Sequence, residues 1–427
     1  MIDLKLLRAD KESIEAKLKS KDPDIELSSI LALDDRMRVI KTNGEELKSA
    51  RNTLSQQIGE KKRLKQDTSL LMEEVAGLGD KISILDQELK SLEEQLVQKL
   101  AAIPNIPRDE IKASLDPKDN VCIKTVGEKR AFTFPIKNHV ELNEHLGLFD
   151  FKRGAKVSGS GWPVYRHFGA QLEWALIHYM IDTHLENGFE MIMPPLLVQK
   201  EIMFGSGQLP KFEKQLFKLT DADYPLYLIP TAEIALNGLY YDEIFKEEDL
   251  PKKFVAYTPC FRREAGAAGS QERGLIRMHQ FNKVEMFAFA TPDQADAVFD
   301  QMMASAEKVL QGLELHYRNM LLVTGDMSFA AAKTVDIECY LPGQNRYYEV
   351  SSVSNCTDYQ ARRSKTRYKR KEEKPELLYT LNGSGLATSR LMVALLENNQ
   401  REDGSVALPA VLHKYLNGMK ELRCPTS

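Results

Sequence analysis

The chain has 427 residues, and its 58 Lys and Arg residues nearly balance its 62 Asp and Glu residues, which gives a formal net charge of −4 at pH 7. This length predicts two domains, and the charge balance excludes a globally basic protein, so any nucleic-acid surface has to be a local patch. There is no apolar run of membrane-spanning length, no apolar leader and no CxxC pair among the five cysteines, so we expect a cytoplasmic chain with reduced thiols, no membrane association and no zinc site.

Two heptad patterns in the first hundred residues predict a long helical hairpin. In the first pattern Leu33, Ile40, Leu47 and Leu54 recur every seven residues, and in the second, apolar residues alternate spacings of three and four over residues 75–96. The polar stretch KQDTS separates the patterns, and so short a connection favours antiparallel packing. We therefore predict an antiparallel coiled-coil arm over about residues 30–100, each helix being roughly 50 Å long at about 1.5 Å per residue.

The segment AAIPNIPRDEI marks a domain boundary, because Pro104 and Pro107 prevent continuation of the helix. We predict an N-terminal domain over residues 1–110 and a second domain over residues 111–427. In the second domain, strand-like runs follow one another around residues 254–290 with no helix between them, while helical patterns flank them. Consecutive strands favour an α+β fold with an antiparallel sheet, which we expect to have about six or seven strands, over a doubly wound sheet.

The stretch FRREAGAAGSQERGLIRMHQF, residues 261–281, is typical of a strand, a loop and a second strand. This hairpin places Arg262 and Glu264 beside Arg277 and Phe281. Guanidinium groups bind phosphate oxygens, an aromatic ring stacks on a purine, and a carboxylate accepts from an exocyclic amine, so the hairpin has the groups of an ATP site. The chain has neither GxxxxGK[ST] nor GxGxxG as another phosphate loop. A charged surface hairpin with one core Phe is the alternative.

Several motifs, in order along the chain, resemble those of bacterial-type seryl-tRNA synthetases, a family of class II aminoacyl-tRNA synthetases. FRRE through RMHQF is similar to the second class II motif, NGSGLATSRLMVALLEN to the third, and GFEMIMPPLL to the first, dimer-forming motif. GSGQLPKFEKQLFKL, PTAE and YYEVSSVSNCTDYQARR are similar to stretches peculiar to the seryl branch. The resemblance spans nearly the whole chain and implies a homodimer with a class II catalytic domain after a tRNA-binding domain.

For the nucleotide, the resemblance implies that ATP is held for attack at its α-phosphate. Arg262 would hold the α-phosphate, Phe281 and Arg390 would cover the two faces of the adenine, and Arg277 would reach the γ-phosphate together with Arg390. Catalysis would rest on these three arginines, and Mg²⁺, which prefers oxygen ligands, would be held by Glu349 and Ser352. The expected ATP-binding residues are Arg262, Arg263, Glu264, Arg277, Met278, Phe281, Glu349, Val350, Ser351, Ser352 and Arg390.

For the amino acid, the resemblance implies a serine pocket formed by Thr231, Ala232, Glu233, Glu285 and Ser384. Thr231 and Glu233 would grip the ammonium group, and Glu285 and Ser384 would hydrogen-bond the serine hydroxyl. Such a pocket rejects alanine, because alanine leaves the buried polar groups unpaired. The alternatives are that Glu285 is a strand carboxylate paired with Lys283 or Arg277, and that Ser384 is a turn residue.

The predicted arm carries basic residues near its tip, Lys61, Lys62, Arg63 and Lys65, and a local stripe of this kind suffices to contact a phosphate backbone. In the family that the chain resembles, this helical hairpin reaches the long variable arm of the serine tRNA. The resemblance therefore implies tRNA(Ser), and also tRNA(Sec), as partners. A heptad hairpin is otherwise most often a dimerisation or spacer element. The basic run over residues 361–374 is compatible both with RNA contact and with a solvated loop.

The chain departs from the family pattern at two places. Residues 269–273 read GSQER where family members commonly read GRDTR, and TSR at residues 388–390 replaces VGR, so that Ser389 adds a side chain beside Arg390. Neither departure removes a residue to which chemistry is assigned. Two other functions stay open: a homologue that activates a small amino acid and loads a carrier protein, against which the long arm argues, and a coiled-coil scaffold with a vestigial catalytic domain, against which the retained site residues argue.

Overall fold

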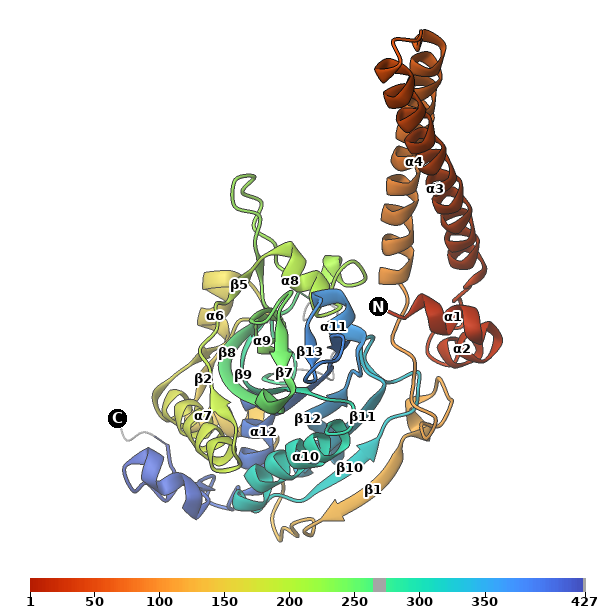
Figure 1. Ribbon diagram of the computed structural model, residues 1–427. Helices are drawn as coiled ribbons and strands as arrows, with labels where there is room; N and C mark the ends of the chain where they lie inside the picture. Colours follow the sequence, from red (N-terminus) through yellow and green to blue (C-terminus); the bar gives the residue numbers. More distant parts are fainter. Residues whose placement is uncertain (264–273, 425–427) are drawn as a thin grey trace. The chain divides into compact units, whose positions relative to one another are not determined.

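The computed structural model describes residues 1–263 and 274–424, and the chain divides into two compact units (Figure 1). One unit consists of Ile2–Ile103, and the other of Met1 with Pro104–Ser427. Within the described ranges, no helix combines the length and the apolar character that crossing a membrane requires.

The smaller unit consists of four helices, α1 (Leu4–Ala9), α2 (Lys11–Lys19), α3 (Ser28–Arg63) and α4 (Ser69–Ala101). Helices α3 and α4 lie side by side (Figure 1). Lys48, in the middle of α3, pairs with Asp86 at 3.0 Å, whereas Ser29, at the start of α3, accepts a hydrogen bond from Lys99 near the end of α4. The paired residues are closer in sequence near the turn than at the far end of the helices, so the two helices are antiparallel. The predicted hairpin is confirmed.

The apolar heptad residues lie along the contact between the two helices. Ile40, Ile82, Leu92 and Leu96 are buried, and Leu33, Leu47 and Leu54 are half-buried. Arg8 of α1 holds both carboxylate oxygens of Asp34 on α3, with N–O distances of 2.5 and 2.6 Å, and so ties the short helices to the hairpin. The four basic residues predicted at the tip, Lys61, Lys62, Arg63 and Lys65, are exposed.

The larger unit is built on an eight-stranded sheet with the order β1-β10-β11-β12-β15-β9-β8-β4. Its strands are β1 (Val121–Val126), β4 (Glu190–Met191), β8 (Lys252–Phe261), β9 (Gln280–Ala290), β10 (Tyr317–Leu321), β11 (Lys333–Leu341), β12 (Arg346–Asn355) and β15 (Tyr379–Ala387). All neighbours are antiparallel except β4 and β8. The α+β class is confirmed. The sheet exceeds the expected six or seven strands because the exposed β1 and the two-residue β4 complete its edges.

The remaining elements cover the sheet or connect its strands. The longer helices of this unit are α5 (His139–Leu146), α6 (Phe151–Ser158), α7 (His167–Glu186), α10 (Ala295–Gly312) and α12 (Thr388–Asn398), and the shorter ones are α8 (Lys200–Gly205), α9 (Ala232–Gly238) and α11 (Tyr359–Ser364). Short strands form small sheets, namely β2 (Phe149–Asp150) with β3 (Val164–Tyr165), β5 (Leu197–Val198) with β6 (Tyr227–Leu228), β7 (Ile244–Lys246) with β13 (Arg367–Lys369) and β14 (Glu376–Leu377), and β16 (Val406–Ala407) with β17 (Glu421–Leu422).

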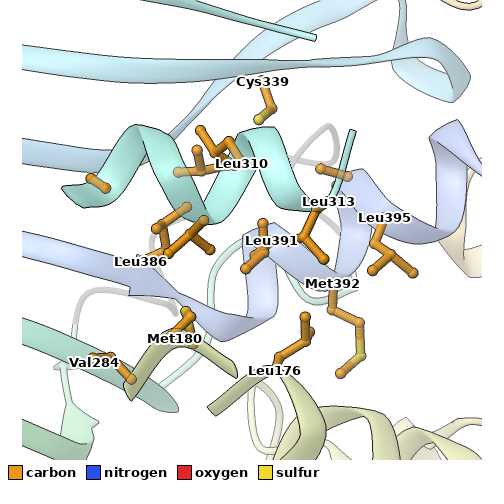
Figure 2. Close-up of a cluster of buried hydrophobic side chains, with 14 of the residues drawn as sticks. Leu176, Met180, Val284, Leu310, Leu313, Cys339, Leu386, Leu391, Met392 and Leu395 are labelled. Carbon is orange, nitrogen blue, oxygen red and sulfur yellow. The ribbon is translucent and has the colours of Figure 1, made fainter. Parts of the chain in front are cut away.

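Strand β9 shows why the sheet is buried on both faces. Val284 and Met286 belong to the main apolar core with α7, α10 and α12, and Figure 2 shows Leu310 of α10 and Leu391 of α12 among the side chains of that core. Phe287, on the opposite face of the strand, packs in a second cluster with residues of α9 and α11. Successive side chains of a strand point to opposite faces, so the face that carries Phe287 also carries Phe281 and Glu285 toward the candidate site.

Candidate active site

A cavity of about 490 Å³ lies on the sheet face opposite the main core. Its walls come from β9, β12 and β15, from the starts of α9 and α12, from Arg262 just after β8, and from the segments between α8 and β6 and between β10 and β11. Small molecules usually bind in large concave sites into which several polar groups point. Of the predicted site residues, the cavity brings together Thr231, Glu233, Arg262, Arg277, Met278, Phe281, Glu285, Glu349, Val350, Ser352, Ser384 and Arg390.

Three predicted residues that the structure describes, Ala232, Arg263 and Ser351, do not line this cavity. Ala232 is fully buried in the second apolar cluster, and Arg263 is exposed. Ser351 is also fully buried. Its hydroxyl donates to the Ser384 carbonyl at 2.5 Å, on the neighbouring strand β15. Glu264 lies outside the described residues, as does the divergent stretch 269–273.

The β8–β9 hairpin brings Arg262 and Phe281 together. The backbone N–H of Arg262 donates to the His279 carbonyl at 2.8 Å, which continues the strand pairing one residue beyond β8. The Arg262 guanidinium carbon lies 5.2 Å from the centre of the Phe281 ring, and its Nε donates to the Pro230 carbonyl at 3.3 Å. A guanidinium and an aromatic ring therefore meet at one wall of the cavity, as an ATP site requires.

A β-bulge in β12 puts Glu349 and Ser352 on one face. Residues three apart in a regular strand point to opposite faces. In β12, Glu349 pairs with Glu338 and Ser351 pairs with Ile337, so Val350 is an extra residue without a partner on β11. This bulge restores the alternation, and both Glu349 and Ser352 line the cavity.

A second irregularity, in β15, shapes the wall that leads to α12. Ser384 pairs with Glu285 and Ala387 pairs with Lys283, so one residue too many lies between the two pairs. Leu386 takes up the difference with a φ of +95°, which is strained for a leucine. The Ser351 hydroxyl bond to the Ser384 carbonyl holds this segment, as does a contact of 3.1 Å between the Gly385 carbonyl and Nε2 of the buried His184.

Glu285 and Ser384 face each other across β9 and β15 at the cavity wall. Glu285 is 2% exposed and forms an ion pair with Lys283, with an N–O distance of 2.5 Å. The buried hydroxyl of Ser384 has no hydrogen-bond partner among the described residues. Buried polar groups are normally hydrogen-bonded, so an unpaired hydroxyl in a cavity wall indicates a ligand group. The ion pair with Lys283 does not exclude this role, because Lys283 also lines the cavity.

Glu233 is the second acidic group of this wall. Thr231 caps α9 and accepts hydrogen bonds from the Glu233 backbone at 3.3 Å and from Lys283 at 2.8 Å. Gln360 donates to Glu233 Oε1 at 2.6 Å, and Asn382 donates to the same oxygen at 3.1 Å. Burial, with a contribution from the charge of Glu285, raises the pKa of Glu233 to about 7 despite the Gln360 bond.

Sequence reasoning missed several residues of the site. The sequence could have indicated Asn382, because it lies two residues before Ser384 and therefore on the same face of a strand. Asp336 pairs in register with Ser352, and burial together with the charge of Glu349 raises the pKa of its carboxyl well above the usual range. Gln360 lies on α11, and no pattern in the sequence indicates that its side chain contacts Glu233.

Three arginines of the basic run over residues 361–374 form ion pairs with carboxylates. Arg362 pairs with Asp358, and Arg367 pairs with Asp242. Arg370 forms ion pairs with several carboxylates, those of Glu247, Asp293, Glu373 and Glu376. These pairings favour a structural role for the arginines over contact with RNA.

Comparisons with known proteins agree on one family. The model described as "Seryl-tRNA synthetase N-terminal domain" matches residues 1–107, and "tRNA synthetase class II core domain (G, H, P, S and T)" matches residues 216–399. The chain is 52% identical over 422 residues to a serine–tRNA ligase of Chlamydia abortus, which covers 99% of this chain and 100% of that protein. It is also similar to two solved structures. One is a Pyrococcus horikoshii seryl-tRNA synthetase complexed with ATP, with a TM-score of 0.94, 36% identity and 100% of both chains covered. The other is a cytoplasmic serine–tRNA ligase from Naegleria fowleri in complex with AMP, with a TM-score of 0.89, 27% identity and 100% and 99% covered.

The charge coupling between Glu233 and Glu285 is directly measurable. In Glu285→Gln we expect the pKa of Glu233 to fall, because a negative charge that opposes its ionisation is removed. An NMR titration of the labelled glutamate carboxyl carbons measures this pKa. Glu338→Gln is the control, since Glu338 pairs with Arg318 and does not line the cavity. An unchanged Glu233 pKa in Glu285→Gln would contradict the coupling.

Proposed function

The chain belongs to the seryl-tRNA synthetase family, and we propose that its cavity activates L-serine with ATP to seryl-adenylate and then transfers the seryl group to tRNA(Ser). It is thus a serine–tRNA ligase, an aminoacyl-tRNA synthetase that converts ATP to AMP and pyrophosphate. One observation supports the assignment of roles above all: a single cavity combines Arg262, Phe281 and Arg390 with the buried pair Glu285 and Ser384. The first group suits a nucleotide, and the second suits a small hydroxyl.

The nucleotide end works by positioning and charge. Arg262 is assigned to the α-phosphate, Phe281 and Arg390 to the two faces of the adenine, and Arg277 to the γ-phosphate. Arg390 Nη1 donates to the Glu349 carbonyl at 2.9 Å and lies 3.1 Å from Glu349 Oε2, so its guanidinium is oriented before ATP binds. The serine carboxylate then attacks the α-phosphorus in line and pyrophosphate leaves, with no protein side chain as nucleophile.

The donor set at Glu349 and Ser352 fits Mg²⁺. Carboxylate and hydroxyl oxygens are ligands that this hard cation accepts, and ATP phosphates and water complete its shell. Burial, and after it the charge of Glu349, raises the pKa of the neighbouring Asp336 carboxyl, and a cation would offset that charge. The metal would supply charge neutralisation for the pyrophosphate that leaves. Glu349 also keeps its contact with Arg390.

The serine end holds the two polar groups of the amino acid. We assign the ammonium contact chiefly to Glu233, because Thr231 Oγ1 already accepts from the Glu233 backbone and from Lys283. The serine hydroxyl meets Glu285 and Ser384. Alanine would leave both groups unpaired in a buried wall, which explains rejection by binding alone.

The helical hairpin is assigned to tRNA. Its exposed tip residues Lys61, Lys62, Arg63 and Lys65 present positive charge suited to the phosphate backbone of tRNA(Ser), and of tRNA(Sec). We further propose that the protein is cytoplasmic and that it forms a homodimer. Exposed apolar side chains of the first motif and of α7 support the dimer, among them Met193 at 82% and Trp174 at 53% exposed.

ATP–pyrophosphate exchange with each of the twenty amino acids tests the proposed function. We expect exchange with serine and little with the others. Arg262→Ala should reduce the exchange rate by roughly 10²-fold or more, because it removes a group that stabilises charge developing at the α-phosphate. Exchange that prefers another amino acid would overturn the substrate assignment, and a near-normal rate in Arg262→Ala would remove Arg262 from the catalytic residues.

Ser384→Ala tests the hydroxyl pocket with little risk to the fold, because the Ser384 hydroxyl has no hydrogen-bond partner among the described residues. Loss of one hydrogen bond to serine should lower kcat/KM for serine by about 10-fold, the equivalent of about 1.4 kcal/mol. The KM for ATP and the melting temperature should not change. If the KM for ATP rises while that for serine stays the same, Ser384 does not belong to the serine pocket.

Excision of residues 33–98 tests the arm. The Lys99–Ser29 hydrogen bond brings the two helices together near their ends, so a short turn is able to replace the hairpin. We expect pyrophosphate exchange to survive and transfer of serine to tRNA to fall steeply, because the arm supplies phosphate contacts. Neutralising Lys61, Lys62, Arg63 and Lys65 together should weaken tRNA binding and reduce its dependence on salt. Normal charging of tRNA by both variants would make the arm a spacer and favour the carrier-protein function.

A further inference from the structure

Gln360, on α11, is fully buried and uses its side-chain amide to join three parts of the site wall. Its Nε2 donates to Glu233 Oε1 at 2.6 Å and to the Ser206 carbonyl at 3.0 Å. Its Oε1 accepts from the hydroxyl of Thr380, on β15, at 2.7 Å. The amide thus has a partner for both of its N–H groups and for its oxygen.

We propose that Gln360 is a positioning residue for serine binding. It fixes the Glu233 side chain so that the protein holds one carboxylate oxygen and the other is left for the ammonium group of the substrate. The inference rests on the proposed function for the role of Glu233. Gln360 itself does not line the cavity, so it acts through Glu233.

The geometry of the amide donors supports this role. Gln360 and Asn382 both donate to Oε1 of Glu233, so Oε2 is the oxygen left for a ligand. The Asn382 bond is longer, at 3.1 Å, and the same nitrogen also lies 3.4 Å from Cys356 Sγ. Gln360 is therefore the closer of the two donors.

The Ser206 carbonyl and the Glu233 carboxylate, which both only accept, determine which way the Gln360 amide faces. A reversed amide would turn its oxygen toward the Glu233 carboxylate, where two acceptors would repel each other, and would leave the Ser206 carbonyl without its donor. In the observed orientation the Thr380 hydroxyl donates to Oε1 and so holds the amide in place. A residue on β15, whose side chain is fully buried, thus influences the carboxylate on α9.

The same amide connects Glu233 to the segment that follows α8. Ser206, Gly207 and Gln208 line the cavity, and the Gln360 bond holds the first of them by its carbonyl. Arg363, one turn further along α11, donates to the Leu209 carbonyl at 3.1 Å. Helix α11 therefore fixes both the carboxylate and the segment beside it.

The charges around Glu233 make its ionisation a sensitive measure of the Gln360 contact. Glu285 opposes the ionised form, whereas Lys283 and Arg262 favour it. The Gln360 bond also favours it, so its loss should raise the pKa of Glu233 further. Because the ionised carboxylate is the form that binds an ammonium group, the low-pH fall in kcat/KM for serine should then move to higher pH.

Gln360→Met tests the proposal, because Met has a similar length and neither donates nor accepts a strong hydrogen bond. We expect the KM for serine to rise by about 10-fold or more, the KM for ATP to stay the same, and both the Glu233 pKa and the low-pH limb of serine kcat/KM to move upward. Asn319→Leu is the matched control. Asn319 is a buried amide that donates to the Glu307 carboxylate, but neither residue lines the cavity, so none of these quantities should change.

Thr380→Val covers the case in which Gln360→Met does not fold, since it keeps the Gln360 donors and removes only the hydroxyl that holds the amide by its oxygen. Its expected effects have the same direction and a smaller size. A folded Gln360→Met with unchanged serine KM and unchanged Glu233 pKa would overturn the proposal, as would a similar upward shift in Asn319→Leu or a Thr380→Val variant without any shift. Absence of serine-dependent exchange in the unmodified protein would instead contradict the proposed function, while the NMR titration of Glu233 would still test the Gln360 contact.

Discussion

The site depends on the register between β12, β15 and β9, because this register decides which side chains of the three strands reach the cavity. One face of these strands packs on α7, α10 and α12 in an apolar core, so a slip by one residue would bury the polar set and expose the apolar set. The bulge at Val350 and the irregularity before Ala387 then adjust the alternation locally. They turn Glu349 and Ser352 to the same side, where Arg390 contacts Glu349, so a regular sheet would not bring Glu349 and Ser352 to the cavity together.

The cavity collects carboxylates that are costly to bury without a partner. Glu233 and Asp336 have pKa values raised by burial and by a neighbouring carboxylate, while Glu285 is held by Lys283. An ammonium group at one end and a divalent cation at the other would offset these negative charges. These carboxylates therefore favour the cationic groups of the substrates that we propose, and the complementarity of the site to them is chiefly one of charge.

The sequence predicted the parts of the site whose residues are close together in the chain. The β8–β9 hairpin brings Arg262 and Phe281 together as its strand-loop-strand pattern indicates, and the helical hairpin follows from its heptads. The bulge at Val350 was out of reach, because it appears only when β12 is aligned with β11. Gln360 was missed for the same reason: its partners Glu233 and Ser206 lie more than a hundred residues away. Contacts of this kind depend on tertiary packing, which local patterns do not contain.

The pH response of the site is separable from that of its supporting structure. His184 holds the strained turn of β15 through the Gly385 carbonyl and a contact of 2.7 Å with the Ser305 hydroxyl, and burial lowers its pKa to about 4. A histidine with a depressed pKa stays neutral above that value, so these contacts and the strain at Leu386 persist through the neutral range. Glu233, with a pKa of about 7, titrates within that range. Acidification from pH 8 to pH 6 should thus change the charge that serine meets while the strands that present it keep their register.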